Sequence, residues 1–328
     1  MRKIIENLNA FVKFTSLRNP WTNVYGLARS CLAFGTFLTF VFNETHLLFR
    51  PAAGVDSFPV CNGMAKYGIF CLLSSHLDLT RFIVIFILFL VVIGWQPRLT
   101  GVFHWWISFS FVSSAIVVDG GDQVASVLAL LLIPFCLTDN RKWHWNPSEI
   151  SQRHDIWKFI VIALWVAVFF TRLQVSLIYF QAGTAKLNVD EWKDGTAIYY
   201  WALNPMIGLP EWIKPFATPL LSNSLIVVLL SWGTIAFEIL LFTALVIEKK
   251  WRKKLLVYGI VFHLLIVLVF GLVSFFFAMT AALIMFLRPL DEPFNIKQFY
   301  ASYDNFLIKF RKNIFPNFNP HSHGNPKI

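Results

Sequence analysis

Long apolar stretches recur along this chain, each close to the length of a helix that crosses a bilayer. About 20 residues of α-helix span the hydrocarbon core of a membrane. Six such stretches are residues 24–43, 81–95, 102–118, 124–138, 156–180 and 224–247. In the whole chain 57% of the residues are hydrophobic and 14% are charged, against roughly 45–50% and 25% in soluble domains. The sequence therefore predicts an all-α, polytopic integral membrane helix bundle.

The last apolar run, residues 255–287, is too long for one straight span and shorter than two full spans would need. Gly271 and Ser274 interrupt it near its middle, and glycine readily adopts the backbone conformation of a tight turn. We therefore expect two short spans, at 255–271 and 275–288. This gives about eight transmembrane helices, and seven is the alternative.

The distribution of positive charge predicts how the bundle is oriented. With eight spans and a cytoplasmic N-terminus, 20 of the 28 Lys and Arg residues lie in inner segments and six lie in outer ones. Because cytoplasmic loops are enriched in Lys and Arg, this asymmetry predicts that both termini are cytoplasmic. The net charge of +10 is then explained by topology, and no nucleic-acid partner is predicted. Residues 1–23 have no apolar core of a cleavable signal peptide, so we expect the first span to direct insertion.

The expected organisation has three parts. Residues 1–23 form a cytoplasmic N-terminal segment, residues 24–288 form the membrane domain, and residues 289–328 form a basic cytoplasmic tail. Two outer segments interrupt the membrane domain, a loop at 44–80 and a longer segment at 181–223. Because the second is rich in Pro, Trp and Tyr, we expect a cap of short interfacial helices there.

Cysteine usage predicts no metal site, because the four cysteines lack the spacing of metal ligands. Cys61 and Cys71 lie in the outer loop, where a pair of thiols can oxidise to a disulfide. The alternative is that Cys71 lies in the apolar beginning of the second span. Cys31 and Cys136 fall within apolar spans and are expected to be buried.

Chemically capable side chains concentrate where the fifth span leaves the hydrocarbon. Lys186 follows the small residues 182–185, and a lysine at the mouth of an apolar cavity can become a usable base or nucleophile. The alternative is an interfacial lysine that pairs with Asp190 or Glu191. Nearby aromatic residues are candidates for binding a substrate: Trp192, Tyr199, Tyr200 and Trp201.

Two ionisable residues, Glu238 and His263, are expected at a similar membrane depth on adjacent helices. An unpaired ionisable residue there costs roughly 2.5 to over 10 kcal/mol, and a hydrogen bond between the two would reduce that cost. They form either a proton-handling pair or ligand pocket, or an interhelical strut. With Lys186 they are the candidate catalytic residues.

Two arginines also fall within spans. Arg29 is close enough to the inner end of the first span for its side chain to reach the interface. Arg172 lies deeper and is expected to need an acid, with Asp119 or Asp122 as candidates. Arg172, Asp119 and Asp122 complete the predicted substrate-binding residues.

Catalytic sequence motifs are missing. No HExxH, GxSxG, Walker or CxxC motif occurs, so protease, serine hydrolase and ATPase functions have no support. His144, between two tryptophans, is predicted to belong to an interfacial aromatic cluster. No cofactor can be assigned from motifs.

Residues 179–187, 237–242 and 263–271, with Trp192, resemble the membrane domain shared with vitamin K-dependent γ-carboxylase, called the HTTM domain. The resemblance covers most of residues 20–290. It implies a base at Lys186, which in the carboxylase deprotonates a reduced quinone. The carboxylase also has an essential histidine near the start of its fourth span, and residues 120–123 offer none here. This departure favours a retained membrane scaffold with different or no redox chemistry.

Within that superfamily, residues 91–105, 119–123 and 191–200 resemble the sporulation-delaying protein B family. The resemblance implies a multi-pass protein of a bacterial cell membrane. It also implies that the protein, with a partner maturation protein A, matures a secreted peptide toxin from its precursor. The partners implied are the toxin precursor, the partner protein and membrane lipid.

Three functions are compatible with these features. The first is a maturation factor that holds the toxin precursor at the outer leaflet with the cap 181–223. The second is a γ-carboxylase-like enzyme that uses Lys186 as a base on a quinone or the peptide. The third is a toxin exporter or an immunity protein. No internal repeat of the kind found in many transporters is present.

Overall fold

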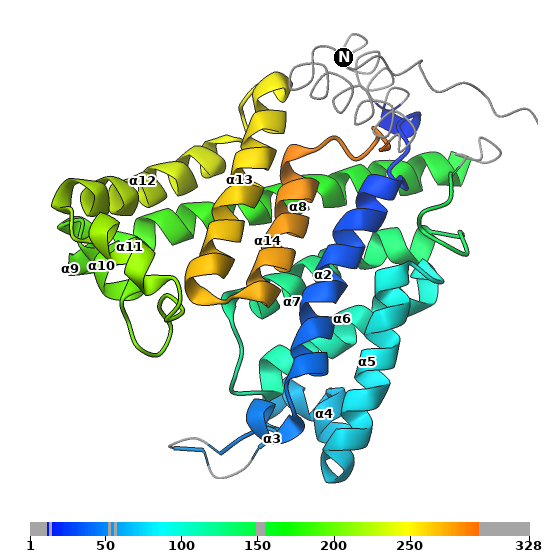
Figure 1. Ribbon diagram of the computed structural model, residues 1–328. Coiled ribbons are helices and arrows are strands. Elements are labelled where there is room, and N and C mark those ends of the chain that lie inside the picture. The colour runs from blue at the N-terminus through cyan, green and yellow to red at the C-terminus, as the bar shows by residue number, and fades with distance from the viewer. Residues whose placement is uncertain (1–11, 13–14, 52–53, 56–57, 149–154, 295–328) are drawn as a thin grey trace, which may run out of the picture. The chain divides into compact units, whose positions relative to one another are not determined.

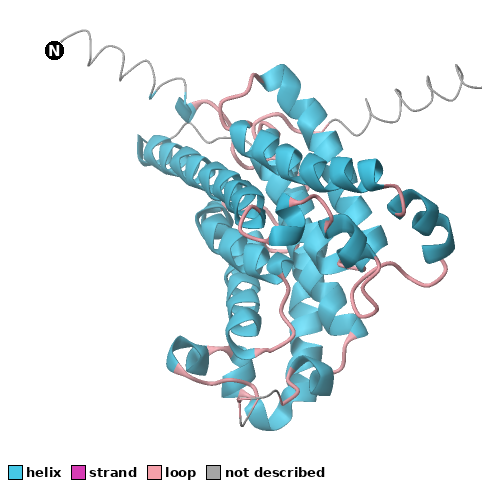
Figure 2. Cartoon of the chain, turned by 90° about the vertical axis from the view of Figure 1, so that its left-hand side faces the viewer, coloured by secondary structure: helices cyan, strands magenta, loops and turns pink. Residues whose placement is uncertain are grey.

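The computed structural model describes residue 12 and residues 15–51, 54–55, 58–148 and 155–294. Within these residues the secondary structure is helical and contains no strand (Figure 2). The long helices are α2 (Asn23–Phe42), α5 (Leu77–Ile93), α6 (Pro97–Ser114), α7 (Gly120–Thr138), α8 (Asp155–Lys186), α12 (Ser224–Thr243), α13 (Lys249–Phe270) and α14 (Val273–Leu287). The all-α prediction is confirmed, and each predicted span overlaps one of these helices.

Membrane insertion follows from the length and composition of the helices. In the described part of the chain, six helices are long and apolar enough to cross a bilayer, and these are α2, α5 with the turn before it, α7, α8, α12 and α13. Helix α14 is apolar but has 15 residues. The chain is therefore a multi-pass membrane protein, while the count of eight spans and the orientation remain predictions.

The helix ends are set by local sequence. Thr22 caps the beginning of α2, and Asp119 and Asp122 form a reciprocal capping box at the beginning of α7. Gly94 and Gly271, both with positive φ, end α5 and α13. The predicted break of the last apolar run at Gly271 is therefore confirmed.

Most helices differ from their predicted bounds by several residues, and α6 and α8 show why. Helix α6 begins at Pro97, five residues before the predicted start, because proline suits the first turn of a helix. Helix α8 continues through Lys186, six residues beyond the predicted end. Ala182 and Ala185 favour helix, so the small residues before Lys186 extend the helix and do not start the cap.

Helices α2 and α14 lie at the centre of the packing. Helix α2 contacts α5, α7 and α14, and α14 also contacts α7, α8 and α13 (Figure 1). Helix α6 packs on α7, α13 packs on α14, and α12 packs on α8. Helix α8 runs obliquely across the group formed by α13, α14 and α2 (Figure 1). At about 1.5 Å per residue its 32 residues extend roughly 48 Å, longer than the hydrocarbon is thick. Its C-terminal end therefore reaches the short helices that follow it.

Those short helices are α9 (Asp190–Lys193), α10 (Ala197–Ala202) and α11 (Lys214–Leu221). They pack against α12 through two small apolar clusters, one around Trp192 and Ile235 and the other around Ala202 and Val227. The predicted series of short helices is therefore present. Its place at the outer interface remains a prediction.

The segment between α2 and α5 is folded against the ends of α2, α5 and α6. Its short helices α3 (Thr45–Leu48) and α4 (Ile69–Leu72) place Phe70 against Phe40 and Phe111 in a buried cluster. In this segment Cys61 and Cys71 are joined by a disulfide.

Reduction of the Cys61–Cys71 bond is expected to cost about 2–3 kcal/mol of stability, because the bond closes a loop of about ten residues in the unfolded chain. Thermal unfolding in detergent with and without reductant measures this loss. The bond itself is tested by alkylation of the purified protein under denaturing conditions, followed by intact mass. Two alkyl groups are expected without reductant, on Cys31 and Cys136, and four after reduction. Four groups without reductant would contradict the disulfide.

Arg29 does not reach the interface as predicted. It is 1% exposed, and its guanidinium donates hydrogen bonds to His144 Nδ1 at 3.1 Å and to Thr100 Oγ1. Burial, together with the charges of Arg29 and Arg141, lowers the pKa of His144 to about 2, so this imidazole is neutral and its Nδ1 accepts. The prediction for Arg29 is wrong because residues 139–148 fold back over the end of the span and supply an acceptor.

His144 sits in a socket that depends on glycine. A Cβ atom at Gly94 would lie 2.4 Å from two atoms of the imidazole, and Gly94 has φ of +87°. Gly94→Ala is therefore expected to destabilise the protein by at least about 2 kcal/mol. Gly233→Ala is the matched control, because nothing lies within 4 Å of its Cβ position. Thermal unfolding in detergent measures both, and an unchanged melting temperature for Gly94→Ala would contradict the socket.

Candidate functional site

Lys186 and Glu238 form an ion pair between α8 and α12. The Lys186 Nζ atom lies 2.8 Å and 2.7 Å from the two carboxylate oxygens of Glu238, and it also donates to the Ala182 carbonyl at 3.1 Å. The Lys186 side chain is 21% exposed and that of Glu238 is 9% exposed. The charges are thus partly shielded from solvent, which strengthens their attraction.

Among the described residues Lys186 pairs with Glu238 and with neither Asp190 nor Glu191, the partners expected of an interfacial lysine. Asp190 pairs with Lys193 at 2.8 Å, while the ammonium group of Lys186 faces the Trp192 ring at 5.3 Å from its centroid. The predicted hydrogen bond between Glu238 and His263 is replaced by the pair with Lys186. His263 instead places its Nδ1 atom 2.7 Å from the Gly259 carbonyl of its own helix.

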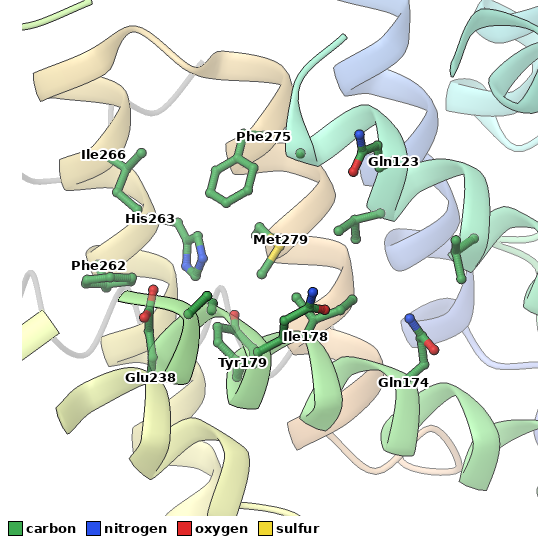
Figure 3. A pocket seen from close by; sticks show the side chains of 16 residues that line it. Gln123, Gln174, Ile178, Tyr179, Glu238, Phe262, His263, Ile266, Phe275 and Met279 are labelled. Atoms are coloured by element: carbon green, nitrogen blue, oxygen red, sulfur yellow. The ribbon is translucent and has the colours of Figure 1, made fainter. Parts of the chain in front are cut away.

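Glu238 and His263 nevertheless line one pocket of about 450 Å³ (Figure 3). The walls come from α7, α8, α12, α13 and α14. Figure 3 shows Glu238, Phe262 and His263 at one end of the view and Gln123 and Gln174 at the other. The structure therefore brings two of the three predicted catalytic residues to a common cavity, with the third bound to the Glu238 carboxylate.

The pocket does contain an imidazole, that of His263, although it lies at the other end of the view from Gln123 (Figure 3). Gly120 and Gln123, at the start of α7, line the same cavity as His263. His263 is 1% exposed and packs edge-on against Tyr179 and Phe262. The imidazole is thus supplied by α13, which sequence comparison at residues 120–123 could not reveal.

Tyr179 and three glutamines line the pocket and were not predicted as site residues. The Tyr179 hydroxyl is buried and has no hydrogen-bond partner among the described residues. A buried hydroxyl normally has a partner, so a bound polar group or water is expected beside it. The glutamines are Gln123, Gln174 and Gln181. For two of these glutamines the sequence does contain a signal: Gln174 and Gln181 are seven residues apart and therefore lie on one face of α8.

Asp119 and Asp122 have local structural contacts in place of the predicted ion pair with Arg172. Asp119 accepts from the Asp122 backbone and from the Ser274 hydroxyl at 2.6 Å, which ties α7 to α14. Arg172 points to the C-terminal end of α14, where it donates to the carbonyls of Met285 and Arg288. The prediction that Arg172 pairs with either aspartate is wrong, because the tilt of α8 carries it to the opposite end of α14.

The predicted aromatic binding residues divide into two groups. Trp192 is 8% exposed and lies against Lys186, so it is part of the environment of the ion pair. Tyr199, Tyr200 and Trp201 are exposed on α10 and do not line the pocket. They are available as a surface beside it.

The arrangement can move a proton. A charged Lys186 is not a base until its proton leaves, and the nearest acceptor is the Glu238 carboxylate at 2.7 Å. Transfer across this contact would leave a neutral amine beside a protonated carboxyl group that faces the pocket. Within the described residues no cluster of His, Cys, Asp and Glu has the geometry of a metal site.

These features define an all-helical, multi-pass membrane protein with a charged pair beside a mainly apolar pocket that is lined by a few polar side chains. The chain belongs to the HTTM domain family, which matches residues 70–290. It is 36% identical over 309 residues to Sporulation-delaying protein SdpB of Bacillus subtilis (strain 168), which covers 93% of this chain and 94% of SdpB. It is 41% identical over 292 residues to Uncharacterized protein YitO of the same organism, which covers 88% of this chain and 93% of YitO. No solved structure matches. Both resemblances predicted from the sequence are therefore confirmed.

Proposed function

We propose that this protein is a maturation factor for a secreted peptide toxin of the sporulation-delaying type, acting in a bacterial cell membrane with a partner maturation protein. The observation that carries the proposal is the pocket beside the Lys186–Glu238 pair, in a chain that shares 36% identity with SdpB over nearly its full length. The short helices α9 to α11 hold exposed Tyr199, Tyr200 and Trp201 next to this site. These aromatic residues provide a surface on which an amphipathic precursor can dock.

The proposed topology has eight spans with both termini in the cytoplasm. In this arrangement α9 to α11 and the disulfide-bonded segment between α2 and α5 lie outside, where the precursor emerges and where a disulfide is stable. The basic beginning of α13 then lies inside, as the excess of lysine and arginine in cytoplasmic segments requires.

Co-expression tests the proposal. Cells that express precursor and partner protein are compared with and without this chain, and the medium is spotted on a sensitive lawn. Killing is expected only when all three are expressed. Killing without this chain would contradict the maturation role. In a separate arm, sensitive cells that express this chain alone are plated with toxin, and survival of those cells would support the immunity function instead.

A second candidate is an enzyme that modifies the precursor or a quinone, and the geometry of the pocket favours it specifically. The residues present fit an aromatic ring with polar substituents, since Phe262, Phe275 and His263 provide flat faces and the Tyr179 hydroxyl has no partner in the described part of the chain. A reduced quinone, when bound, supplies an acidic hydroxyl proton. The Glu238 carboxylate, which is the member of the ion pair that lines the pocket, would accept this proton beside Lys186.

A further inference from the structure

A second pocket lies on the other side of α13, between α13 and α12. It measures about 610 Å³ and is mainly apolar. Helix α12 packs on α8 while α13 packs on α14, so the two helices meet near the turn that joins them and diverge from there (Figure 1). Phe237 and Phe262, with ring centroids 5.1 Å apart, bridge the diverging helices at the floor of this groove.

The rim of the groove is exposed and apolar. Leu240, Tyr258, Val261 and Leu265 all line it and are 44% to 61% exposed. Both helices are candidate membrane spans, so these side chains face the hydrocarbon of a bilayer. An apolar groove that opens to lipid fits an acyl chain.

One end of the groove carries a positive charge and aromatic rings. Lys254 lines the groove and its Nζ atom lies 4.5 Å from the centroid of the Trp251 ring, which lines it too. The neighbouring Lys249 and Lys250 pair with Glu292 and Glu248. Among the described residues no carboxylate pairs with Lys254. Its ammonium group is therefore available to an anion at the membrane interface.

We propose that the α12–α13 groove binds one molecule of an anionic phospholipid. An acyl chain lies along Val261 and Leu265 on the Phe237–Phe262 floor, and the phosphate contacts Lys254 beside Trp251. Tryptophan and lysine at a membrane interface are a combination that recognises lipid headgroups. Two observations favour an anionic lipid as the occupant: the Lys254 ammonium group, which pairs with no carboxylate of the described residues, and the apolar groove that is continuous with it.

The lipid site borders the candidate functional site. Phe262 lines both the groove and the pocket that holds Glu238 and His263. A chain in the groove packs against one face of this ring and so supports the wall of the pocket. The inference concerns a different ligand from the toxin precursor and does not depend on the maturation role.

Native mass spectrometry of the purified full-length protein tests the site. The protein in detergent is titrated with phosphatidylglycerol or phosphatidylcholine of identical chains, and the lipids retained per protein are counted. One molecule of phosphatidylglycerol is expected to bind per protein. At the same lipid concentration the occupancy by phosphatidylcholine is expected to be roughly five-fold lower, because one lysine contributes about 1 kcal/mol at an anionic headgroup. Equal retention of the two lipids, or no retention of either, would overturn the proposal.

Four variants locate the site. Lys254→Gln is expected to lower phosphatidylglycerol occupancy roughly five-fold and leave phosphatidylcholine unchanged, whereas Lys254→Arg retains binding. Lys142→Gln, an exposed lysine on the loop after α7, is the matched control and is expected to bind as wild type. Val261→Trp fills the groove and is expected to lower the occupancy of both lipids.

The result that overturns the assignment is wild-type lipid occupancy in Lys254→Gln, or an equal loss in Lys142→Gln. Wild-type occupancy in Val261→Trp would also overturn it. Because Lys254 is exposed, its variants are expected to fold, and size-exclusion profiles verify this. The Lys254 series decides the question even if Val261→Trp fails to fold.

Discussion

Lys186→Met is expected to abolish toxin maturation and also to destabilise the protein. The substitution removes both hydrogen bonds to a Glu238 carboxylate whose side chain is 9% exposed. A buried carboxylate left without its cation costs roughly 3 kcal/mol. Loss of a group that transfers a proton lowers activity by at least about 100-fold. Thermal unfolding in detergent and the mass of the secreted peptide measure the two effects.

The double variant Lys186→Met with Glu238→Gln separates the chemical role from the structural one. It removes both charges, so most of the lost stability is expected to return, because no uncompensated charge remains in the site. Maturation is expected to remain absent. If the double variant matures the precursor like wild type, Lys186 and Glu238 form only a structural strut between α8 and α12. Lys193→Met, which breaks the exposed pair with Asp190, is the control and is expected to change neither property.

Ala185→Trp is expected to lower maturation at least ten-fold without unfolding the protein. Ala185 lines the pocket of about 450 Å³ and is exposed. An indole ring at this position can therefore fill the proposed substrate pocket without disturbing the packing of buried residues. Because a ligand pocket buries most of the surface of its ligand, an indole ring that fills the pocket is expected to prevent most substrate binding. The same cell assay and a melting curve measure the effect.

Leu187→Trp is the matched control for Ala185→Trp. Leu187 is two residues further along, 40% exposed, and does not line the pocket. The control is expected to mature the precursor normally. Equal maturation in both variants would show that the pocket does not take part.

The helices were predictable because the bilayer imposes a simple rule on sequence. Backbone groups in hydrocarbon must be satisfied internally, so each apolar run of sufficient length forms a helix. The break at Gly271 was equally accessible, because glycine permits the positive φ that ends α13. The extension of α8 to Lys186 was missed because the prediction ended the helix where apolar residues stop.

The site was only partly predictable because it depends on contacts between distant residues. Lys186 and Glu238 were both named from the sequence, but 52 positions separate them and only the packing of α12 on α8 makes them a pair. Arg29 was misjudged for the same reason, since His144, its acceptor, lies 115 residues away. The importance of Tyr179 arises from its burial beside the pocket, which no local pattern encodes.

The most direct test of the maturation role is the intact mass and fragmentation of the toxin peptide secreted by cells that carry precursor and partner, with or without this protein. Cells that carry the protein are expected to secrete the mature toxin, and cells that lack it are expected to secrete only unprocessed precursor. Restoring the wild-type protein on a plasmid is expected to restore the mature mass. Mature toxin from cells that lack the protein would contradict the proposed function.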